Sequence, residues 1–391
     1  MTTNAEDLFK NKNILKTTGF IIAAAMMLFF FNSISNNTFF SQRNLTMLFK
    51  QSAVLMILAS SLMVLLIERN FDIAGGSGVY LTGVVVAILI VRLGVSMYIA
   101  ISVGLFLGII MGMANGFFIG YLSLPAFIVT LAFQQMFRGI GYTLTNAATV
   151  GPMPKNFTLI SEAYISPAAS LVIIIFTFAF FVISQVFRFQ RMKKYGDGLG
   201  YLIRHIAGAV LIASLFAWVF FGYRGFPMAV IIALFVAGLM HFITSKTVFG
   251  RHAYIIGGNI EAAFLAGIRT KRRIFQAYLL EGLMYGIGGI VLTARLGGAA
   301  ATGGALLELD AVAACCIGGT SMNGGIGTIG GMLTGCLVLT AIDNVMSLMN
   351  VSSYLQMVVK GLILLIAICL DLYVNKSQFQ FKLKKKSPAG K

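Results

Sequence analysis

Ionisable side chains that lie inside long apolar segments are the residues of this chain best placed to take part in chemistry. They are Asp72, Arg138, Glu281, Glu308, Asp310, Asp343 and Lys360. A charge in an apolar environment costs about 3 kcal/mol or more, so such residues pair with one another, line a solute path or relay ions. Asp343 and Lys360 fall on adjacent apolar segments, and for these two a structural ion pair is favoured over a transport role.

A polar stripe runs along the apolar segment that begins near Pro125, and proline is favoured in the first turn of a helix. Its members recur every three or four residues: Thr130, Gln134, Arg138, Gly141 and Thr145. Within lipid such a stripe must face protein or water, so it either lines a solute path or bonds to a neighbouring helix. The candidates for a path are Asn115, Thr130, Gln134 and Arg138, with Asp72 and Asp310 as second choices.

Several kinds of catalytic site are missing from the sequence. The nucleotide-binding pattern G-x-x-x-x-G-K-[ST] does not occur, so the chain cannot hydrolyse ATP alone by that route. No H-E-x-x-H motif or cysteine cluster supports a metal site, and the cysteines lie in apolar or glycine-rich segments without C-x-x-C spacing. The glycine-rich run 318–331 lacks the lysine that would reach a phosphate, and it is interpreted as a tight turn between packed segments. We therefore expect neither a cofactor nor a metal on this chain, and no enzymatic activity of its own.

The elements that must position these residues are membrane helices. The chain has 391 residues, of which 58% are hydrophobic and 10% charged, whereas soluble domains carry about 25% charged residues. Apolar runs long enough to cross a bilayer are expected near 17–36, 45–67, 76–92, 97–120, 124–145, 165–187, 205–222, 226–245, 274–296, 306–322, 326–349 and 352–373. The segments 76–92 and 306–322 are short and glycine-rich, so either could be broken or re-entrant. The sequence thus predicts an all-α polytopic membrane protein with about 10–12 transmembrane helices.

The net charge of +17 does not indicate nucleic acid, because the basic residues gather in four places. These are the N-terminal segment, the stretches 188–204 and 246–273, and the C-terminal tail. Short loops rich in lysine and arginine stay in the cytoplasm, which places both chain ends there. The expected organisation is a cytoplasmic segment 1–16, a transmembrane domain 17–373 and a basic cytoplasmic tail 374–391.

The polar island 246–273 is longer than a turn between two membrane helices needs to be. Within it, Asn259 can cap a helix that begins at Ile260, and Glu261 is favourable in the first turn of that helix. The small residues of this helix, which would form a smooth surface, are Ala262, Ala263, Ala266 and Gly267. A short helix that lies in a groove of another protein is a recurrent mode of recognition. The island is therefore predicted to dock on a soluble partner.

Glycines spaced four residues apart form two ladders along predicted membrane helices. They are Gly104, Gly108, Gly112, Gly116 and Gly120 in the first, and Gly327, Gly331 and Gly335 in the second. Such a face lets a neighbouring backbone approach closely. Tight helix packing is the favoured interpretation, and a sliding surface between two conformations is the alternative.

Several stretches together resemble the membrane permease subunits of bacterial ABC importers for monosaccharides, of the ribose and xylose type. They are NGFFIGYLSLPAFIVTLAFQQMFRG at 115–139, FGRHAYIIGGNIEAAFLAGI at 249–268, LTARLGGA at 292–299, ELDAVAACCIGGTSMNGGIGTIGG at 308–331 and VVKGLILLIAICLD at 358–371. The segment 188–226 is similar to the extra part of the longer xylose-type permeases, which carry two added helices. One departure falls in ERNFDIAGGSG at 68–78, where Ala74 and Gly75 replace the usual serine and valine.

The resemblance implies a type II-like ABC importer permease in the bacterial inner (cytoplasmic) membrane, paired with a second copy as a homodimer. It also implies a periplasmic sugar-binding protein and a separate ATPase subunit that binds ATP and Mg, while this chain contacts membrane lipid and the monosaccharide, with D-xylose as the first expectation. The residues expected to couple to the ATPase are Gly257, Gly258, Asn259, Glu261, Ala262, Ala263 and Gly267.

Other functions remain open from the sequence. A permease for several monosaccharides, such as galactose, ribose, glucose and arabinose, is the nearest alternative. A secondary sugar transporter driven by an ion gradient could use the acidic residues of the membrane segments. A passive channel and a membrane-embedded enzyme are further alternatives, and the missing catalytic motifs disfavour the enzyme.

Overall fold

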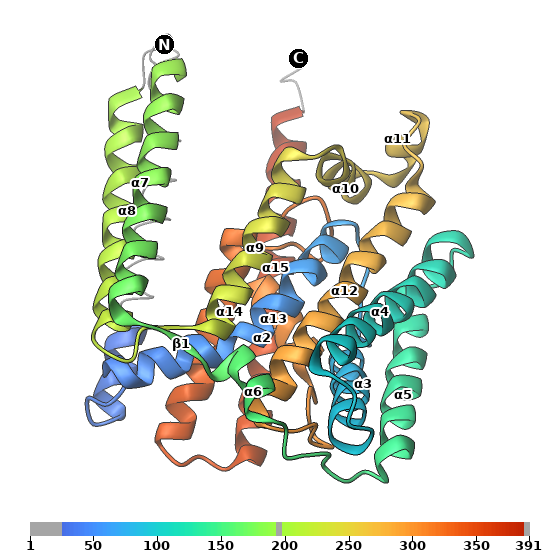
Figure 1. The fold of residues 1–391 in the computed structure, drawn as a ribbon. Helices are drawn as coiled ribbons and strands as arrows, with labels where there is room; N and C mark the ends of the chain where they lie inside the picture. Colours follow the sequence, from blue (N-terminus) through green and yellow to red (C-terminus); the bar gives the residue numbers. More distant parts are fainter. Residues whose placement is uncertain (1–25, 193–197, 387–391) are drawn as a thin grey trace, which may run out of the picture.

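The computed structural model describes residues 26–192 and 198–386, and within them the chain forms a bundle of membrane helices (Figure 1). Seven helical stretches of the described residues are long and apolar enough to cross a membrane. They are α2 (Gln42–Ile67), α3 with the π-helical turn η1 (Gly75–Arg92), α4 with the π-helical turn η2 (Met97–Tyr121), Pro167–Phe187 of α7, α9 (Met228–Lys246), α12 (Thr270–Leu296) and α14 (Ile329–Leu348). The expected all-α polytopic fold is confirmed.

The remaining predicted crossings are found in shorter or more polar helices. The helix α5 (Ala126–Thr145) carries the polar stripe, and the helices α8 (Gly198–Phe221) and α15 (Ser353–Lys386) contain the shorter apolar stretches His205–Phe221 and Ser353–Cys369. The predicted cytoplasmic segment 1–16 and residues 17–25 of the first predicted crossing, 17–36, lie outside the described residues. The predicted tail 374–391 begins as a continuation of α15, which is described as far as Lys386.

The two ends of the bundle carry different small elements. The helices α10 (Val248–Gly258) and α11 (Ile260–Leu265) lie where α9 ends and α12 begins, at the top of Figure 1. The helix α6 (Lys155–Glu162) and the short antiparallel pair β1 (Tyr164–Ile165) and β2 (Phe226–Pro227) lie at the opposite end. The basic residues of 246–273 predict that the first end faces the cytoplasm, and on that prediction we call it the cytoplasmic end.

Two helices begin inside the protein instead of at a membrane surface. After α2 the chain runs without helix through residues 68–74, and α3 begins at Gly75 in the buried interior. The helix α13 (Leu307–Ile317) has 11 residues, which is about 16 Å and too short for a hydrocarbon core of about 30 Å. A side chain added at Gly76 would meet the carbonyl oxygen of Gly304 and the carboxylate of Glu308. The N-terminal ends of these two broken helices therefore lie against each other.

The core of the bundle is built around α2, which is buried along nearly its whole length. It packs against α9, α12, α13 and α14. The first glycine ladder lies on α4 and faces α12, where a side chain at Gly112 would meet Cα of Gly282 at 2.7 Å. This close approach of two backbones confirms the prediction of tight helix packing along the first ladder.

An ion-pair cluster joins three helices at the C-terminal part of the bundle. The ammonium of Lys360 on α15 lies 2.8 Å from a carboxylate oxygen of Asp343 on α14, which confirms the predicted pair. It also lies 2.8 Å from an oxygen of Asp310 on α13. Two carboxylates thus share one partly buried cation, and this neutralises part of their charge within the membrane.

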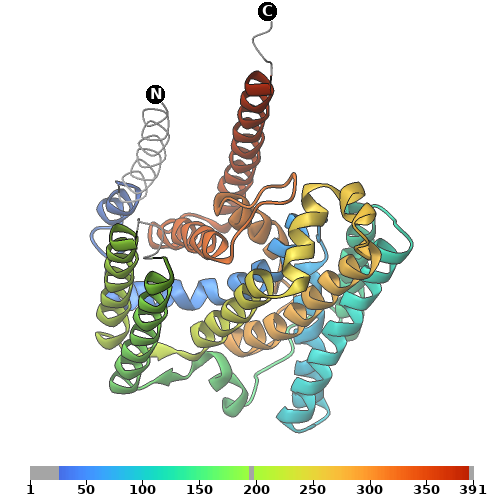
Figure 2. The same ribbon diagram turned by 90° about the horizontal axis from the view of Figure 1, so that it is seen from above.

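The helices α7 (Pro167–Met192) and α8 form a hairpin that stands to one side of the bundle (Figures 1 and 2). Its attachment lies at the end that carries β1 and β2, where Phe216 and Phe220 of α8 stack with Phe226 and contact Phe49 of α2. The amide of Gln42 also donates to the carbonyl oxygen of Trp218 at 3.1 Å. The segment 188–226, expected to be an addition to the core, contains the end of α7 and all of α8.

Candidate functional site

The predicted helix of the cytoplasmic island is present as α11. The side chain of Asn259 caps it, since its Oδ1 accepts hydrogen bonds from the backbone N–H groups of Glu261 and Ala262, both at 3.0 Å. Glu261 lies exposed in the first turn, where the helix dipole favours a negative charge. The local sequence signal therefore predicted both the start and the capping of this helix correctly.

The exposed surface of α11 contains Ala262, Ala266 and Gly267 of the expected smooth patch, but Ala263 does not belong to it. Ala263 is fully buried against Ile256 and Ile268, so it holds the helix to the protein and cannot face a partner. The most exposed large apolar residues of this helix are Phe264 and Leu265, whose side chains are 70% and 85% accessible. Large apolar residues exposed on a cytoplasmic tip are typical of protein interaction sites. Phe264 and Leu265 were visible in the sequence of the island, but their exposure follows only from the fold of α11.

Gly267 ends α11 for a conformational reason. Its φ is +80°, and a side chain added there would meet nothing within 4 Å. Its N–H donates to the carbonyl oxygen of Phe264 at 2.9 Å, which closes the last turn of the helix. The left-handed conformation, not the smoothness of a surface, is therefore what requires glycine at this position.

The inner side of the α10–α11 hairpin is bonded to the turn between α2 and α3. The guanidinium of Arg69 donates from Nε to the carbonyl oxygen of Gly257 at 2.7 Å and from Nη2 to that of Gly258 at 3.1 Å. A side chain at Gly257 would collide with the carbonyl oxygen of Ile67, whereas one at Gly258 would meet nothing within 4 Å. The two adjacent glycines thus have different roles, and Gly257 marks the junction with the first broken helix.

The same hairpin also contacts the glycine-rich turn 318–328 that connects α13 with α14. The hydroxyl of Tyr254 on α10 donates to the carbonyl oxygen of Gly327 at 2.7 Å. The N–H of Gly325 donates to the carbonyl oxygen of Ile67 at 2.9 Å, so the two turns are bonded to each other as well. The predicted tight turn is confirmed, and one cytoplasmic hairpin is linked to both broken helices.

Glu68, the neighbour of Arg69, is a buried carboxyl group in this junction. It is 3% exposed, and its carboxylate oxygens have no hydrogen-bond partner among the described residues. Burial raises the pKa of Glu68 to about 8, although the positive charge of Arg273 acts in the opposite direction. The junction therefore contains an acid that holds its proton at neutral pH.

A polar centre lies where the N-terminal ends of α3 and α13 meet. The Nε2 of Gln134 donates to Oε1 of Glu308 at 2.8 Å, and Arg138 donates to the carbonyl oxygen of Gly303 at 2.8 Å. The guanidinium of Arg138 also lies 4.7 Å from the ring centre of Tyr80 on α3, within range of a cation–π interaction. Half-helix ends that meet near the bilayer midplane are a feature of solute sites in many transporters. Gln134 and Arg138 of α5 hold these two ends together.

The predicted path residues Asp72 and Asn115 belong to a second, separate cluster. The hydroxyl of Tyr285 donates to the carboxylate of Asp72, and the amide of Asn115 donates to that hydroxyl at 3.3 Å. The hydroxyl of Tyr278 donates to the carbonyl oxygen of Phe71 at 2.6 Å. Asn115 has no exposed surface and Asp72 is 1% exposed. In this conformation both residues hold the non-helical segment 68–74 in place and neither faces an open path.

The polar stripe of α5 faces the protein, so the structure favours its bonding role over direct lining of a path. Thr130 has no exposed surface, and its hydroxyl donates to the carbonyl oxygen of Ala126 at 2.9 Å. Gly141 packs against the ring of Tyr80, and Thr145 is 1% exposed. Asp310, another predicted path residue, is bound in the ion-pair cluster with Lys360 and does not join Gln134 and Arg138.

The outward face of α5 carries a different set of small and polar residues. They are Ala132, Gln135, Gly139 and Thr143, all of them exposed. Each follows a member of the predicted stripe by one or two positions, and a side chain at Gly139 would meet nothing within 4 Å. The spacing was visible in the sequence, but a helical period does not tell which of two adjacent polar faces is covered.

Comparisons with known proteins agree with this architecture. Residues 44–368 match the family described as "Branched-chain amino acid transport system / permease component". The xylose transport system permease protein XylH of Escherichia coli (strain K12) is 36% identical over 317 residues, which cover 79% of this chain and 80% of that protein. The ribose import permease protein RbsC of Bacillus subtilis (strain 168) is 33% identical over 307 residues, 78% of each chain.

The L-arabinose transport system permease protein AraH of Escherichia coli (strain K12) is 32% identical over 317 residues, 81% of this chain and 79% of that protein. No solved structure matches the chain. The apolar helices of the described residues, together with the match to a permease-component family, define a multi-pass membrane permease. The chain belongs to the permease-component family of ABC importers, in the group of the monosaccharide permeases, and the resemblance noted in its motifs is confirmed.

Proposed function

We propose that this chain is the translocation subunit of an ABC importer that carries a monosaccharide, with D-xylose as the first candidate, into the cytoplasm across the bacterial inner membrane. The support for xylose is the 36% identity to a xylose permease, compared with 33% and 32% for the ribose and arabinose permeases. Because this margin is small, a permease that accepts several monosaccharides is the second candidate.

The proposal rests mainly on the α10–α11 hairpin. One side of this hairpin is an exposed apolar tip, and the other side is hydrogen-bonded to the turns of two broken helices. Phe264 and Leu265 form an exposed apolar surface to which a cytoplasmic ATPase subunit would bind. On the other side, Arg69 and Tyr254 bond the hairpin to the turns that precede α3 and follow α13. Movement of the tip by an ATPase that binds ATP and Mg would displace both turns together.

Alternating access would follow from a movement of those turns, because they adjoin the broken helices α3 and α13. The helices α3 and α13 meet at Gly76 and Glu308, and Gln134 and Arg138 of α5 bridge their ends. A shift of either broken helix would change these bonds and re-orient α5. The chain's own residues therefore act by binding and moving, and no covalent step is needed on this subunit.

The solute path is proposed to lie along the outward face of α5, closed by a second copy of the chain. Gln135 offers an amide and Thr143 a hydroxyl to an uncharged sugar, and Gly139 leaves room for its ring. A sugar carries no net charge, so no charged cage is required along this face. A periplasmic sugar-binding protein would deliver the sugar at the end that carries α6.

Reconstitution tests this function. The chain is placed in sealed vesicles with and without a cognate ATPase and binding protein, and uptake of labelled xylose, ribose, arabinose and galactose is measured. Uptake that requires both partners and ATP supports the proposal, and the ranking of sugars identifies the substrate. Uptake by the chain alone that collapses with an uncoupler would establish a secondary transporter instead, and uptake without any energy source would establish a channel.

A further inference from the structure

The side of α12 that meets the non-helical segment 68–74 carries three polar side chains, spaced three and four residues apart. Residues at this spacing share one face of a helix, and here they are Tyr278, Glu281 and Tyr285. The hydroxyl of Tyr278 donates to the carbonyl oxygen of Phe71. The hydroxyl of Tyr285 donates to the carboxylate of Asp72. Glu281 therefore lies between the two bonds that attach this segment to α12.

Glu281 is buried without a counter-charge among the described residues. It has no exposed surface, and both of its carboxyl oxygens lack a hydrogen-bond partner there. The hydroxyl of Ser61 faces it from α2 and donates to the carbonyl oxygen of Leu58 at 3.3 Å. The thiol of Cys315 faces it from α13 and donates to the carbonyl oxygen of Ala59 at 3.6 Å. No ion pair joins Glu281 to a lysine or arginine in the part of the chain that the structure describes.

Asp72 has the hydrogen bonds that Glu281 lacks. Its carboxylate accepts from the hydroxyl of Tyr285 and, at 2.8 Å, from the backbone N–H of Ala74. Hydrogen bonds to the charged form of a carboxyl group favour that form, and a nearby negative charge disfavours a second one. The charge of Asp72 acts on Glu281, and a buried acid without partners takes up a proton instead of ionising. Asp72 is thus suited to carry a negative charge, and Glu281 is suited to carry a proton.

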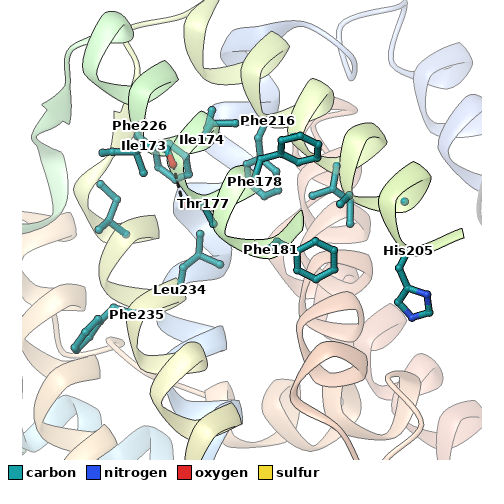
Figure 3. A pocket seen from close by; sticks show the side chains of 15 residues that line it. Ile173, Ile174, Thr177, Phe178, Phe181, His205, Phe216, Phe226, Leu234 and Phe235 are labelled. Carbon is teal, nitrogen blue, oxygen red and sulfur yellow. Dashed lines mark hydrogen bonds between the residues drawn. The ribbon is translucent and has the colours of Figure 1, made fainter. Parts of the chain in front are cut away.

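The large groove beside the bundle gives Glu281 no polar surroundings. This groove lies between α7, α8 and α9, has a volume of about 740 Å³, and is lined mostly by aliphatic and aromatic side chains, with Phe178, Phe216 and Phe235 among them (Figure 3). None of its lining residues is acidic, and none belongs to α12. Glu281 is instead enclosed by the packing of α12 against α2 and by α13. Its carboxyl group is therefore kept from water.

We propose that Asp72 and Glu281 form a buried carboxyl pair that binds one proton, held on Glu281, while Asp72 stays ionised. The proton removes a second negative charge from the contact between α12 and the segment 68–74. Two ionised groups in this contact would repel each other and would push the segment away from Tyr278 and Tyr285. The bound proton depends neither on the transported solute nor on the ATPase.

Infrared spectroscopy of the purified full-length chain at neutral pH tests this pair, because a protonated carboxyl group and a carboxylate absorb in different regions. Glu281→Gln replaces the acid by an amide of similar size, and Asp72→Asn makes the same change at its partner. The matched control is Glu261→Gln, since Glu261 lies exposed on α11. The melting temperatures of the unaltered chain and of Glu281→Gln are also measured with added Na⁺ and with added K⁺.

Glu281→Gln should remove the signal of one protonated carboxyl group per chain, and Glu261→Gln should leave the signal unchanged. Asp72→Asn should also leave it unchanged, and this result does not require Glu281→Gln to fold. An undiminished signal in Glu281→Gln, or a loss in Asp72→Asn, would overturn the proposal. So would a rise in melting temperature with Na⁺ or K⁺ that Glu281→Gln abolishes, because the two carboxylates would then hold a metal cation.

Discussion

Two hairpins project from the same helical core, and they are attached to it in different ways. The α10–α11 hairpin is bonded through Arg69 and Tyr254 to backbone carbonyls of two turns. The α7–α8 hairpin is held at one end by stacked phenylalanines around Phe220. Directional hydrogen bonds fix both the position and the orientation of an element, whereas apolar packing leaves more freedom to slide. We therefore expect the first hairpin to transmit movement to the core and the second to shift more freely relative to it.

The largest effect is expected when Gly257, the glycine at the junction of the first hairpin with the core, is substituted. In Gly257→Ala the new methyl group collides with the carbonyl oxygen of Ile67. We expect ATP-dependent sugar uptake to fall about a hundredfold, since forcing extra atoms into a packed junction costs about 1–3 kcal/mol. Gly258→Ala is the matched control, because a side chain there meets nothing within 4 Å. Equal uptake by the two variants would contradict the role of the junction.

The second prediction concerns the exposed tip. Phe264→Ala combined with Leu265→Ala removes apolar side chains that the protein itself does not bury. We expect binding to the ATPase subunit to weaken about thirtyfold or more, because apolar anchors at interfaces contribute about 2 kcal/mol or more. Binding is measured by titration in detergent. The thermal stability of the free chain should be unchanged, and a loss of stability with intact binding would show that the tip is structural.

The third prediction distinguishes the effect of the hydrogen bonds of Arg69 from the effect of losing a positive charge at this end of the protein. Arg69→Met removes the donors to Gly257 and Gly258 while it keeps an apolar stem. Each hydrogen bond to a charged group contributes about 1.5–3 kcal/mol, so we expect sugar-stimulated ATPase activity of the complex to fall at least tenfold. Arg251→Met on the exposed side of α10 is the control and should retain activity. Similar losses in both variants would assign the effect to charge alone.

The last prediction concerns the pH dependence of stability. The pKa of Glu68 is raised to about 8 from 4.5 in the folded chain. Above pH 4.5 the unfolded chain releases this proton while the folded chain keeps it, so stability falls as the pH rises toward 8. Glu68→Gln does not titrate. We expect its melting temperature to decline less between pH 5 and pH 8 than that of the unaltered chain, and an identical decline would contradict the assignment.

The sequence predicted features that depend on neighbouring residues along the chain. The cap at Asn259, the glycine ladder of α4 and the pair of Asp343 with Lys360 follow from local spacing, and the structure contains them. The bonds of Arg69 to the hairpin were not foreseen, because they join positions about 190 residues apart that only the tertiary fold brings together. The same limit applies to the polar stripe of α5. Its helical period was evident in the sequence, but which face of the helix is covered depends on where α13 lies.

The most direct test of the central claim follows one residue of the proposed path while the ATPase works. Gln135→Cys is made in a chain in which the exposed Cys369 is replaced by serine, and its reaction with a maleimide is timed in the assembled transporter with and without ATP. The account predicts that ATP changes the labelling rate severalfold and that Gly257→Ala abolishes this response while the complex stays assembled. A labelling rate that ignores ATP, or that responds equally in the Gly257→Ala variant, would contradict transmission through the junction.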